Sequence, residues 1–229
     1  MPTKTMIAMH ENRHILDVKK NELKQTVLQM SKMTDESFQR ALQCIEQCDR
    51  HNGEMLIIKD QPINQYYDKT ERSGFYVIAS QQPVAHDLRE IVVAMRIASE
   101  LERIADHVAN IAKIRLEISR SDMSGLCVTD LIKLGRDALS IYQLAMTAYR
   151  ELDTGKAESL KEIEARIDQT TNTITLKLFD RMRTDPDLIE DGSRALWILH
   201  TLERIADRAT NIAEQVIYAA TAHEEKLND

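Results

Sequence analysis

Apolar residues recur along most of the chain at alternating steps of three and four, which is the spacing of one face of an α-helix. Two runs show this pattern most fully. The first consists of Ala94, Ile97, Leu101, Ile104, Val108 and Ile111. The second consists of Ala195, Ile198, Leu202, Ile205, Ala209, Ile212 and Val216. No segment shows the sustained two-residue alternation of a β-strand. The pattern therefore predicts an all-α protein.

Polar and helix-breaking stretches divide the chain into six segments. They are residues 49–53, 82–83, 121–125, 153–155 and 184–186. Each segment has roughly 30 residues, enough for a helix of about 45 Å. Long helices with short connections favour two pseudo-symmetric up-down three-helix bundles, in residues 1–122 and 123–229. Pro62 lies inside the second segment, where it is expected to kink the helix.

The chain also contains an internal repeat that supports this division. Residues 101–112 and 202–213 are identical at nine of twelve positions, with an offset of 101 residues. A repeat of such a long period indicates two copies of one structural unit. Both copies contain Leu-Glu-Arg-Ile-Ala-Asp followed by Asn four positions after the Asp.

The repeat places acidic and amide side chains one helical turn apart. Positions i, i+4 and i+8 drift by only about 40° per step, so they form a narrow row on a helix. The two motif rows are Glu102, Asp106 and Asn110, and Glu203, Asp207 and Asn211. Similar rows in the second and fifth segments are Asp60, Asn64 and Asp68, and Glu164, Asp168 and Asn172. Four of the six segments thus present side-chain oxygens in rows.

Two interpretations of these rows compete with metal binding. A single row is more simply a solvated polar face, because it lies nearly opposite the apolar seam. Arg103 and Arg204 could also neutralise the acids by ion pairing. Repetition with the same spacing favours a cation site, since like charges at i, i+4 repel on an isolated helix. Alanines also flank the rows, and small neighbours would let a second acidic row come close. They are Ala98, Ala105, Ala109, Ala206 and Ala213.

The oxygen atoms of such rows define the metals they would bind. Hard oxygen ligands suit magnesium, calcium, manganese or iron rather than zinc or copper. A di-iron carboxylate enzyme is a rival hypothesis, but it usually needs two inward-facing Glu-x-x-His pairs. The chain has one, Glu11 and His14. A third hypothesis is a metal-free helical adaptor whose acidic faces bind partners electrostatically.

Composition narrows the class of protein further. The net charge of −7 argues against non-specific nucleic-acid binding. The first 20 residues lack the apolar region of a signal peptide, and apolar runs are too short for a transmembrane helix. Three cysteines without zinc spacing indicate a reduced, cytoplasmic protein. Trp197 and the pair Tyr66-Tyr67 are expected to be packing residues.

The doubled Leu-Glu-Arg-Ile-Ala-Asp motif, with its Asn, resembles the repeated signature of the PhoU family of phosphate-uptake regulators. The resemblance extends along nearly the whole chain. It implies two three-helix bundles and clusters of iron or another metal held by acidic motifs. It also implies a non-enzymatic cytoplasmic protein, a homodimer, that represses phosphate-starvation genes. The implied partners are the ATPase subunit of the phosphate transporter and the phosphate-sensing histidine kinase, so membrane association would occur only through partners. Some family members serve other phosphate transporters.

Carried onto this sequence, the resemblance assigns metal ligands to both halves. They are Glu102, Asp106, Asn110, Asp60 and Asn64, and Glu203, Asp207, Asn211, Glu164 and Asp168. Three features depart from the family pattern. Ala105 and Ala206 stand where the family often has Gly, and Asn64 replaces an acid. Pro62 is expected to move Asp60 away from its row.

Overall fold

The computed structural model describes residues 4–47, 61–119 and 123–227, and all regular structure in this part of the chain is helical. The long helices are α1 (Lys4–Gln47), α3 (Gln61–Gln81), α4 (Ala85–Glu117), α5 (Val128–Glu151), α7 (Leu160–Thr184) and α8 (Ile189–Thr221). A short helix, α6 (Thr154–Glu158), and a 3-10 turn, η1 (Pro186–Leu188), complete the connections. The prediction of an all-α protein built from two three-helix units is confirmed.

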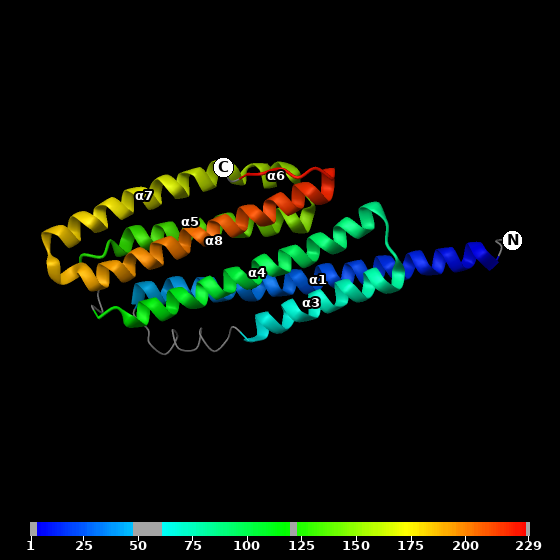
Figure 1. Cartoon of the computed structure of the whole chain (residues 1–229), viewed down its shortest axis with the longest axis horizontal. Helices are drawn as coiled ribbons and strands as arrows, with labels where there is room; N and C mark the ends of the chain where they lie inside the picture. The colour runs from blue at the N-terminus through cyan, green and yellow to red at the C-terminus, as the bar shows by residue number, and fades with distance from the viewer. Residues whose placement is uncertain (1–3, 48–60, 120–122, 228–229) are drawn as a thin grey trace.

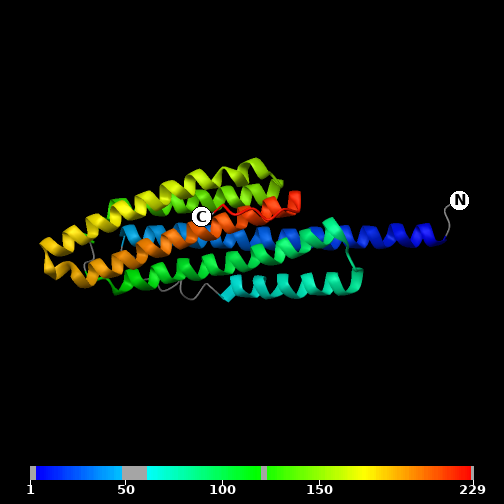
Figure 2. The same ribbon diagram turned by 45° about the horizontal axis from the view of Figure 1, so that its top comes forward.

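The helices of each half pack against one another, α1 with α3 and α4, and α5 with α7 and α8. The halves also share an extensive interface, because α4 and α8 form the closest helix pairing among the described elements. These two helices lie side by side at the centre of the molecule, with α3 beside α4 and α7 beside α8 (Figures 1 and 2). The predicted boundary at residue 122 falls in 120–122, outside the described residues.

The apolar seams predicted from the sequence form the core at this centre. The buried seam residues include Ile97, Leu101, Ile104, Ile111, Ile198, Leu202, Ile205 and Ile212. The flanking alanines are buried as well, since Ala98, Ala105, Ala109, Ala206 and Ala213 are at most 6% exposed. Small side chains at these positions let neighbouring helices approach closely.

Glycine allows the same close approach in both halves, within the helix pairs that carry the acidic rows. A Cβ added at Gly74 of α3 would overlap the side chain of Met95 of α4. A Cβ added at Gly192 of α8 would overlap the side chain of Met182 of α7. The glycine lies on α3 in the first half and on α8, the counterpart of α4, in the second, so the two close approaches are similar in kind but do not occur at repeat-related positions.

Pro62 lies in the first turn of α3, because the described helix begins at Gln61. Residues 48–60, which precede it, lie outside the described part of the chain, so the kink expected at Pro62 stays a prediction. Asp60, which was expected to move with it, lies outside the described residues. None of the helices in the described part has the length and apolarity needed to cross a bilayer.

Candidate metal centre

The acidic rows of the second half face one another across a cavity. α7 lies along α8, and the space between their polar edges measures about 390 Å³. Its lining consists of Glu164, Asp168, Glu203, Arg204, Asp207, Arg208 and Asn211. The structure thus brings together all five of the second-half residues assigned from the sequence. Sequence reasoning did not find Arg208 as part of this site, and no spacing signal distinguishes it.

Burial and mutual repulsion raise the pKa values of Glu164, Asp168 and Asp207 in this cavity. The pKa of Glu164 is raised to about 7 by burial, by the charge of Asp168 and by a hydrogen bond with it. The charges of Asp207 and Glu203 raise it further. A carboxyl group with this pKa is partly protonated at neutral pH. Four acids on one cavity are therefore not all ionised without a cation.

The two neighbouring aspartates respond in the same direction. Burial and the charge of Glu203 raise the pKa of Asp168. Burial and the charges of Glu203 and Asp168 raise the pKa of Asp207, while Arg208 acts against this shift. One guanidinium therefore offsets only part of the accumulated negative charge. A positive charge inside the cavity would relieve the rest.

Asn211 and Arg208 also connect this cavity to the first half. The Asn211 side-chain amide donates a hydrogen bond of 3.3 Å to Oε2 of Glu100 on α4. Arg208 donates to the same oxygen at 3.3 Å. Glu100 was not among the residues singled out from the sequence, because it stands two positions before Glu102, on another face of the helix.

The corresponding row of the first half is more open to solvent. Glu102 is half-buried, whereas Asp106 and Asn110 are exposed. Glu102 lies near α3, because its charge is one of the causes that raise the pKa of Tyr67 on that helix. Burial and the neighbouring Glu71 contribute more to this shift. The structure therefore places Glu102 beside α3 and leaves the other two side chains at the surface.

Asn64 brings a side-chain oxygen to the α3 side of this row. Its Oδ1 atom is buried and has no hydrogen-bond partner among the described residues. A buried acceptor without a donor is unfavourable unless something fills its coordination. This orphaned oxygen fits a cation site.

The alternative interpretation, in which Arg103 and Arg204 neutralise the acidic rows by ion pairing, receives little support from the observed contacts. Arg103 is exposed, and Arg204 lines the cavity of the second half. Neither residue forms an ion pair with a carboxylate in the part of the chain that the structure describes. The motif arginines therefore do not neutralise the acids beside them.

His107 of α4 is half-buried and lies close to α8. Burial lowers its pKa to about 4, and the positive charges of Arg204 and Arg208 act in the same direction. The ring is consequently neutral at physiological pH. Its burial follows from the pairing of α4 with α8, which joins the two halves.

The carboxylates line the cavity without forming a compact cage. Within residues 4–47, 61–119 and 123–227, no three carboxylate, imidazole or thiol side chains converge as a preformed metal site. The donor set itself, four carboxylates and an amide around one cavity, matches the oxygen preference of hard cations. Side-chain rotation or water ligands would complete the coordination.

Comparison with known proteins agrees with the duplicated architecture. The family model of the PhoU domain matches twice, over residues 27–114 and 131–216. The chain is 30% identical over 216 residues to a Streptococcus pneumoniae protein named "Phosphate-specific transport system accessory protein PhoU homolog", covering 94% of this chain and 100% of that protein. A protein of the same name from Clostridium acetobutylicum is 29% identical over 218 residues, covering 95% of this chain and 99% of that protein.

Solved structures show the same fold. The crystal structure of a phosphate transport system regulatory protein PhoU from Streptococcus pneumoniae has a TM-score of 0.82 at 28% identity, over 92% of this chain and 99% of that one. The structure of PhoU from Pseudomonas aeruginosa has a TM-score of 0.85 at 24% identity, over 90% of this chain and 99% of that one. With both halves matched by the family model, the chain belongs to the PhoU family.

Proposed function

We propose that this protein is a non-enzymatic, metal-binding adaptor that represses phosphate uptake and the phosphate-starvation genes. It would do so by joining the ATPase subunit of a phosphate transporter to a phosphate-sensing histidine kinase in the cytoplasm. The observation that carries the proposal is the match of both halves to one family, whose curated relatives are named as accessory proteins of phosphate-specific transport.

The metal part of the proposal is supported by the electrostatics of the second half. Glu164, Asp168, Glu203 and Asp207 would hold the ion, with Asn211 as a further oxygen donor. When bound, the cation would supply charge neutralisation rather than reaction chemistry. Its binding would displace the proton that Glu164 otherwise retains and would link α7 to α8. Iron is the first candidate through the family resemblance, and manganese, magnesium and calcium share the same preference for oxygen.

The first half would form a weaker site of the same kind. Glu102 and the orphaned Asn64 oxygen are its half-buried donors, and Asp106 and Asn110 stand at the surface. Even with Asp60 counted, the first-half set has three carboxylates against four in the second half, and this lowers the attraction for a divalent cation. Two quasi-equivalent sites of unequal affinity are therefore proposed.

An adaptor that acts by docking needs a surface to which its partner proteins can bind. This protein has exposed aromatic side chains that could contribute to such a surface. Trp197 of α8 is 69% exposed, and Phe179 of α7 is 53% exposed. Aromatic residues at such positions are frequent anchors of protein interfaces. These two helices also carry the second acidic row, so metal occupancy and docking would act on the same helix pair.

Deletion of the gene tests the regulatory role. A reporter of phosphate-uptake genes is expected to be derepressed in phosphate-rich medium and restored to repression by the wild-type gene. Unchanged low expression in the deletion strain would exclude this role.

Pull-down of the purified full chain against the transporter ATPase and the sensor kinase tests the adaptor. If the protein captures a different phosphate carrier instead, it is an accessory protein of that carrier rather than of the proposed transporter.

A further inference from the structure

A groove runs between α1 and α3, and it shares no residue with the carboxylate cavity of the second half. It measures about 650 Å³, and all of its lining residues belong to these two helices. Leu23 of α1 and Val77 of α3 lie at its floor and are only 3% and 2% exposed. Figure 2 shows α3 alongside α1, at the edge of the molecule opposite α7. The groove therefore combines an apolar floor with an open position at the surface.

Cations outnumber acids in the lining of this groove. Its four charged side chains are three cations and one carboxylate, Lys19, Lys69, Arg72 and Glu22. Glu22 is paired with Lys19, whose Nζ atom lies 2.8 Å from Oε2 of the carboxylate. Lys69 and Arg72 are exposed, and neither forms an ion pair within the residues that the structure describes. Two positive charges therefore remain at the groove.

The acids beside these cations on α3 do not neutralise them by contact. Asp68 and Glu71 both lie outside the lining of the groove. Glu71 accepts a hydrogen bond of 3.3 Å from Tyr67, which lies on the side of α3 that faces α4. Asp68 is exposed, and among the described contacts it forms no ion pair with Arg72, one turn further along. The two cations are therefore available on the groove side of α3.

A second groove occupies the corresponding place in the other half. The two matches to the family model start at residues 27 and 131, an offset of 104 residues. At this offset, residues 19–26 and 69–77 correspond to residues 123–130 and 173–181. The latter two segments line a groove of about 570 Å³. The internal duplication has thus produced a groove in each half.

The charges of the second groove are balanced, in contrast to those of the first. Its four charged side chains are two cations and two acids, Lys177, Arg181, Asp130 and Asp180. Lys177 pairs with Asp130 at 2.8 Å. The positions that correspond to Lys69 and Arg72 are occupied by Thr173 and Leu176. The architecture therefore does not require cations here, and the excess positive charge is specific to the groove of the first half.

The two cations stand in a row with an aromatic side chain. Lys69, Arg72 and Tyr76 follow one another at steps of three and four, so they share one face of α3. Tyr76 lines the groove and is 66% exposed. The three positions span about 10 Å along the helix axis. Alternate side chains of an extended peptide point to one side about every 7 Å, so three of them span a similar length once the flexible lysine is counted.

We propose that the α1–α3 groove binds an extended acidic segment of a partner protein. Two acidic side chains at alternate positions would pair with Lys69 and Arg72, and an apolar side chain two positions further would contact Tyr76 and Val77. A guanidinium can donate two parallel hydrogen bonds to one carboxylate, which would fix the position of the segment. The surplus of two positive charges over the ion pair of Lys19 matches two carboxylates.

Other occupants agree less well with the same observations. A second copy of this chain bound through a symmetric interface would bring groove against groove and place like charges together. A flat membrane surface would not reach a floor that is recessed between two helices. A hydrated phosphate ion would leave the apolar floor and Tyr76 without a contact. A segment that carries both acidic and apolar side chains uses all of these features.

Titration with a short peptide tests the proposal on the full-length protein. The probe is acetyl-Glu-Ser-Glu-Ser-Leu-amide, and it is expected to shift the labelled methyl groups of Leu23 and Val77 saturably in a methyl spectrum. The peptide with Gln in place of both Glu residues is expected to bind about threefold or more weakly at low salt, since exposed ion pairs are modest in strength. Equal binding of the two peptides, or no saturable shift with the acidic one, would overturn the proposal.

Variants of the groove provide the second measurement. The double variant Lys69→Gln and Arg72→Gln is expected to weaken binding of the acidic peptide by about threefold or more. Arg181→Gln, an exposed change in the groove of the second half, is the matched control and is expected to bind as the wild type does. Circular dichroism checks that each variant is folded. Wild-type affinity in the double variant would contradict the assignment, and the comparison of the two peptides decides the case if that variant does not fold.

Inorganic phosphate and vesicles of phosphatidylglycerol test the other anionic ligands. Neither is expected to shift Leu23 and Val77 in the way that the peptide does. Phosphate that displaces the peptide at equal concentration would show a site for any anion and would overturn the proposal. Vesicles that capture the wild type but not the double variant would overturn it in favour of a membrane surface. These measurements need no metal, transporter or kinase, so their failure would leave the proposed function unaffected.

Discussion

Glu164 and Asp168 stand one turn apart on α7 and line the same cavity. At this spacing the charge of one carboxylate disfavours ionisation of the other. Burial and the charge of Asp168, with smaller contributions from Asp207 and Glu203 of α8, raise the pKa of Glu164 to about 7, so the proton is retained into the neutral range. A cation bound in the cavity would favour the loss of this proton.

The first prediction concerns stability against pH in the presence of a chelator. The pKa of Glu164 is raised above its ordinary value of 4.5, so the folded state binds more protons than the unfolded state between about pH 4.5 and 7. The stabilisation is present below this window and is lost as the pH rises through it. Glu164→Gln is expected to reduce this loss, so its melting temperature in chelator at pH 8 should exceed that of the wild type.

His107 acts in the opposite direction and provides the control for this experiment. Its folded pKa of about 4 lies below the ordinary 6.5, so its contribution to stability rises with pH across that interval. His107→Gln should therefore steepen the fall in melting temperature between pH 5 and 7, whereas Glu164→Gln should flatten it. Identical pH profiles for the wild type and the Glu164 variant would show that the carboxyl group titrates normally.

The second prediction concerns metal content. Replacing Glu203 and Asp207 by Ala removes two of the four carboxylates of the cavity and is expected to abolish metal at the second half. Helicity should be retained, because both side chains are only partly buried and remove repulsion when they are lost. Elemental analysis of protein purified without chelator measures the result. The matched control is the double variant Glu162→Ala and Asp180→Ala, two exposed acids of α7.

Stoichiometric iron or manganese in the wild type and the control, with loss in the double variant, is the expected pattern. Full metal content in the Glu203 and Asp207 variant would exclude these two ligands. A wild-type protein purified without any metal, and unable to bind it on addition, would favour the metal-free adaptor.

The third prediction concerns the first half. Asn64→Asp places a carboxylate where a buried amide oxygen has no donor in the described part of the chain. In chelator this variant is expected to be less stable than the wild type by about 1–3 kcal/mol, the typical cost of an unpaired buried polar group. Added divalent metal should reverse the loss, since the new charge strengthens the site. Thermal melts with and without metal measure both effects, and destabilisation that metal does not relieve would count against a cation site at Asn64.

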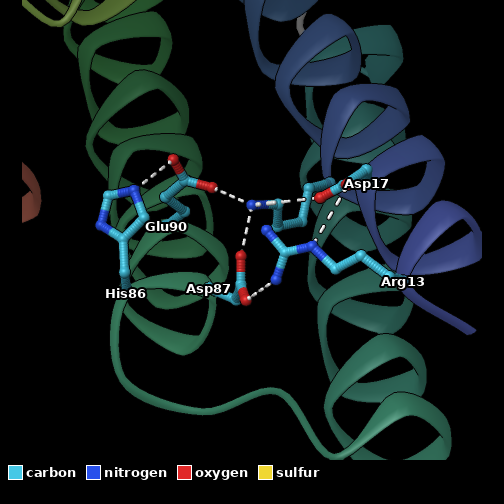
Figure 3. Close-up of polar contacts among 6 residues, drawn as sticks. Arg13, Asp17, His86, Asp87 and Glu90 are labelled. Atoms are coloured by element: carbon cyan, nitrogen blue, oxygen red, sulfur yellow. Dashed lines mark hydrogen bonds and ion pairs between the residues drawn. The ribbon is translucent and has the colours of Figure 1, made fainter. Parts of the chain in front are cut away.

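The fourth prediction concerns the ion pairs that hold α1 to the start of α4. Asp87 is buried and accepts hydrogen bonds of 2.6 Å from both Arg13 and Lys20 (Figure 3). Although burial opposes the shift, these cations lower its pKa, so the stabilisation is present at neutral pH and is lost as the pH falls through the folded pKa. Asp87→Asn should cost about 1–3 kcal/mol at pH 7 and much less in strong acid. Denaturant titration measures this, with the exposed Asp137→Asn as control. An equal cost at both pH values would mean that charge is not the cause.

Several features of this protein could be predicted because they depend on local spacing. The steps of three and four that end in Ile111 and Val216 predicted helices whose buried faces are the ones observed. The alanines beside the acidic rows predicted that another helix would come close, and they are buried against one. A helical period is set by backbone geometry alone, so it can be read without knowledge of the neighbours.

Other features could not be predicted, because they depend on which helices become neighbours. Trp197 was expected to pack, but it is exposed, whereas Tyr66 and Tyr67 do pack against the core. Trp197 lies on α8 about 100° around the helix from the seam residue Ile198, at the flank of the buried face rather than within it. His107 of α4 is half-buried because α4 pairs with α8, a neighbour that spacing along one helix does not identify.

The sequence by itself determined the helices, the duplication and the rows of oxygens, since each is a repeat along one chain. The tertiary structure decided that the α7 row meets the α8 row across a cavity, that Glu100 links the halves through Arg208, and that Lys69 and Arg72 line a groove with α1. The reason is physical. Spacing along a helix fixes which side chains share a face, whereas the pKa of a carboxyl group or the burial of a hydroxyl depends on charges and atoms contributed by other helices.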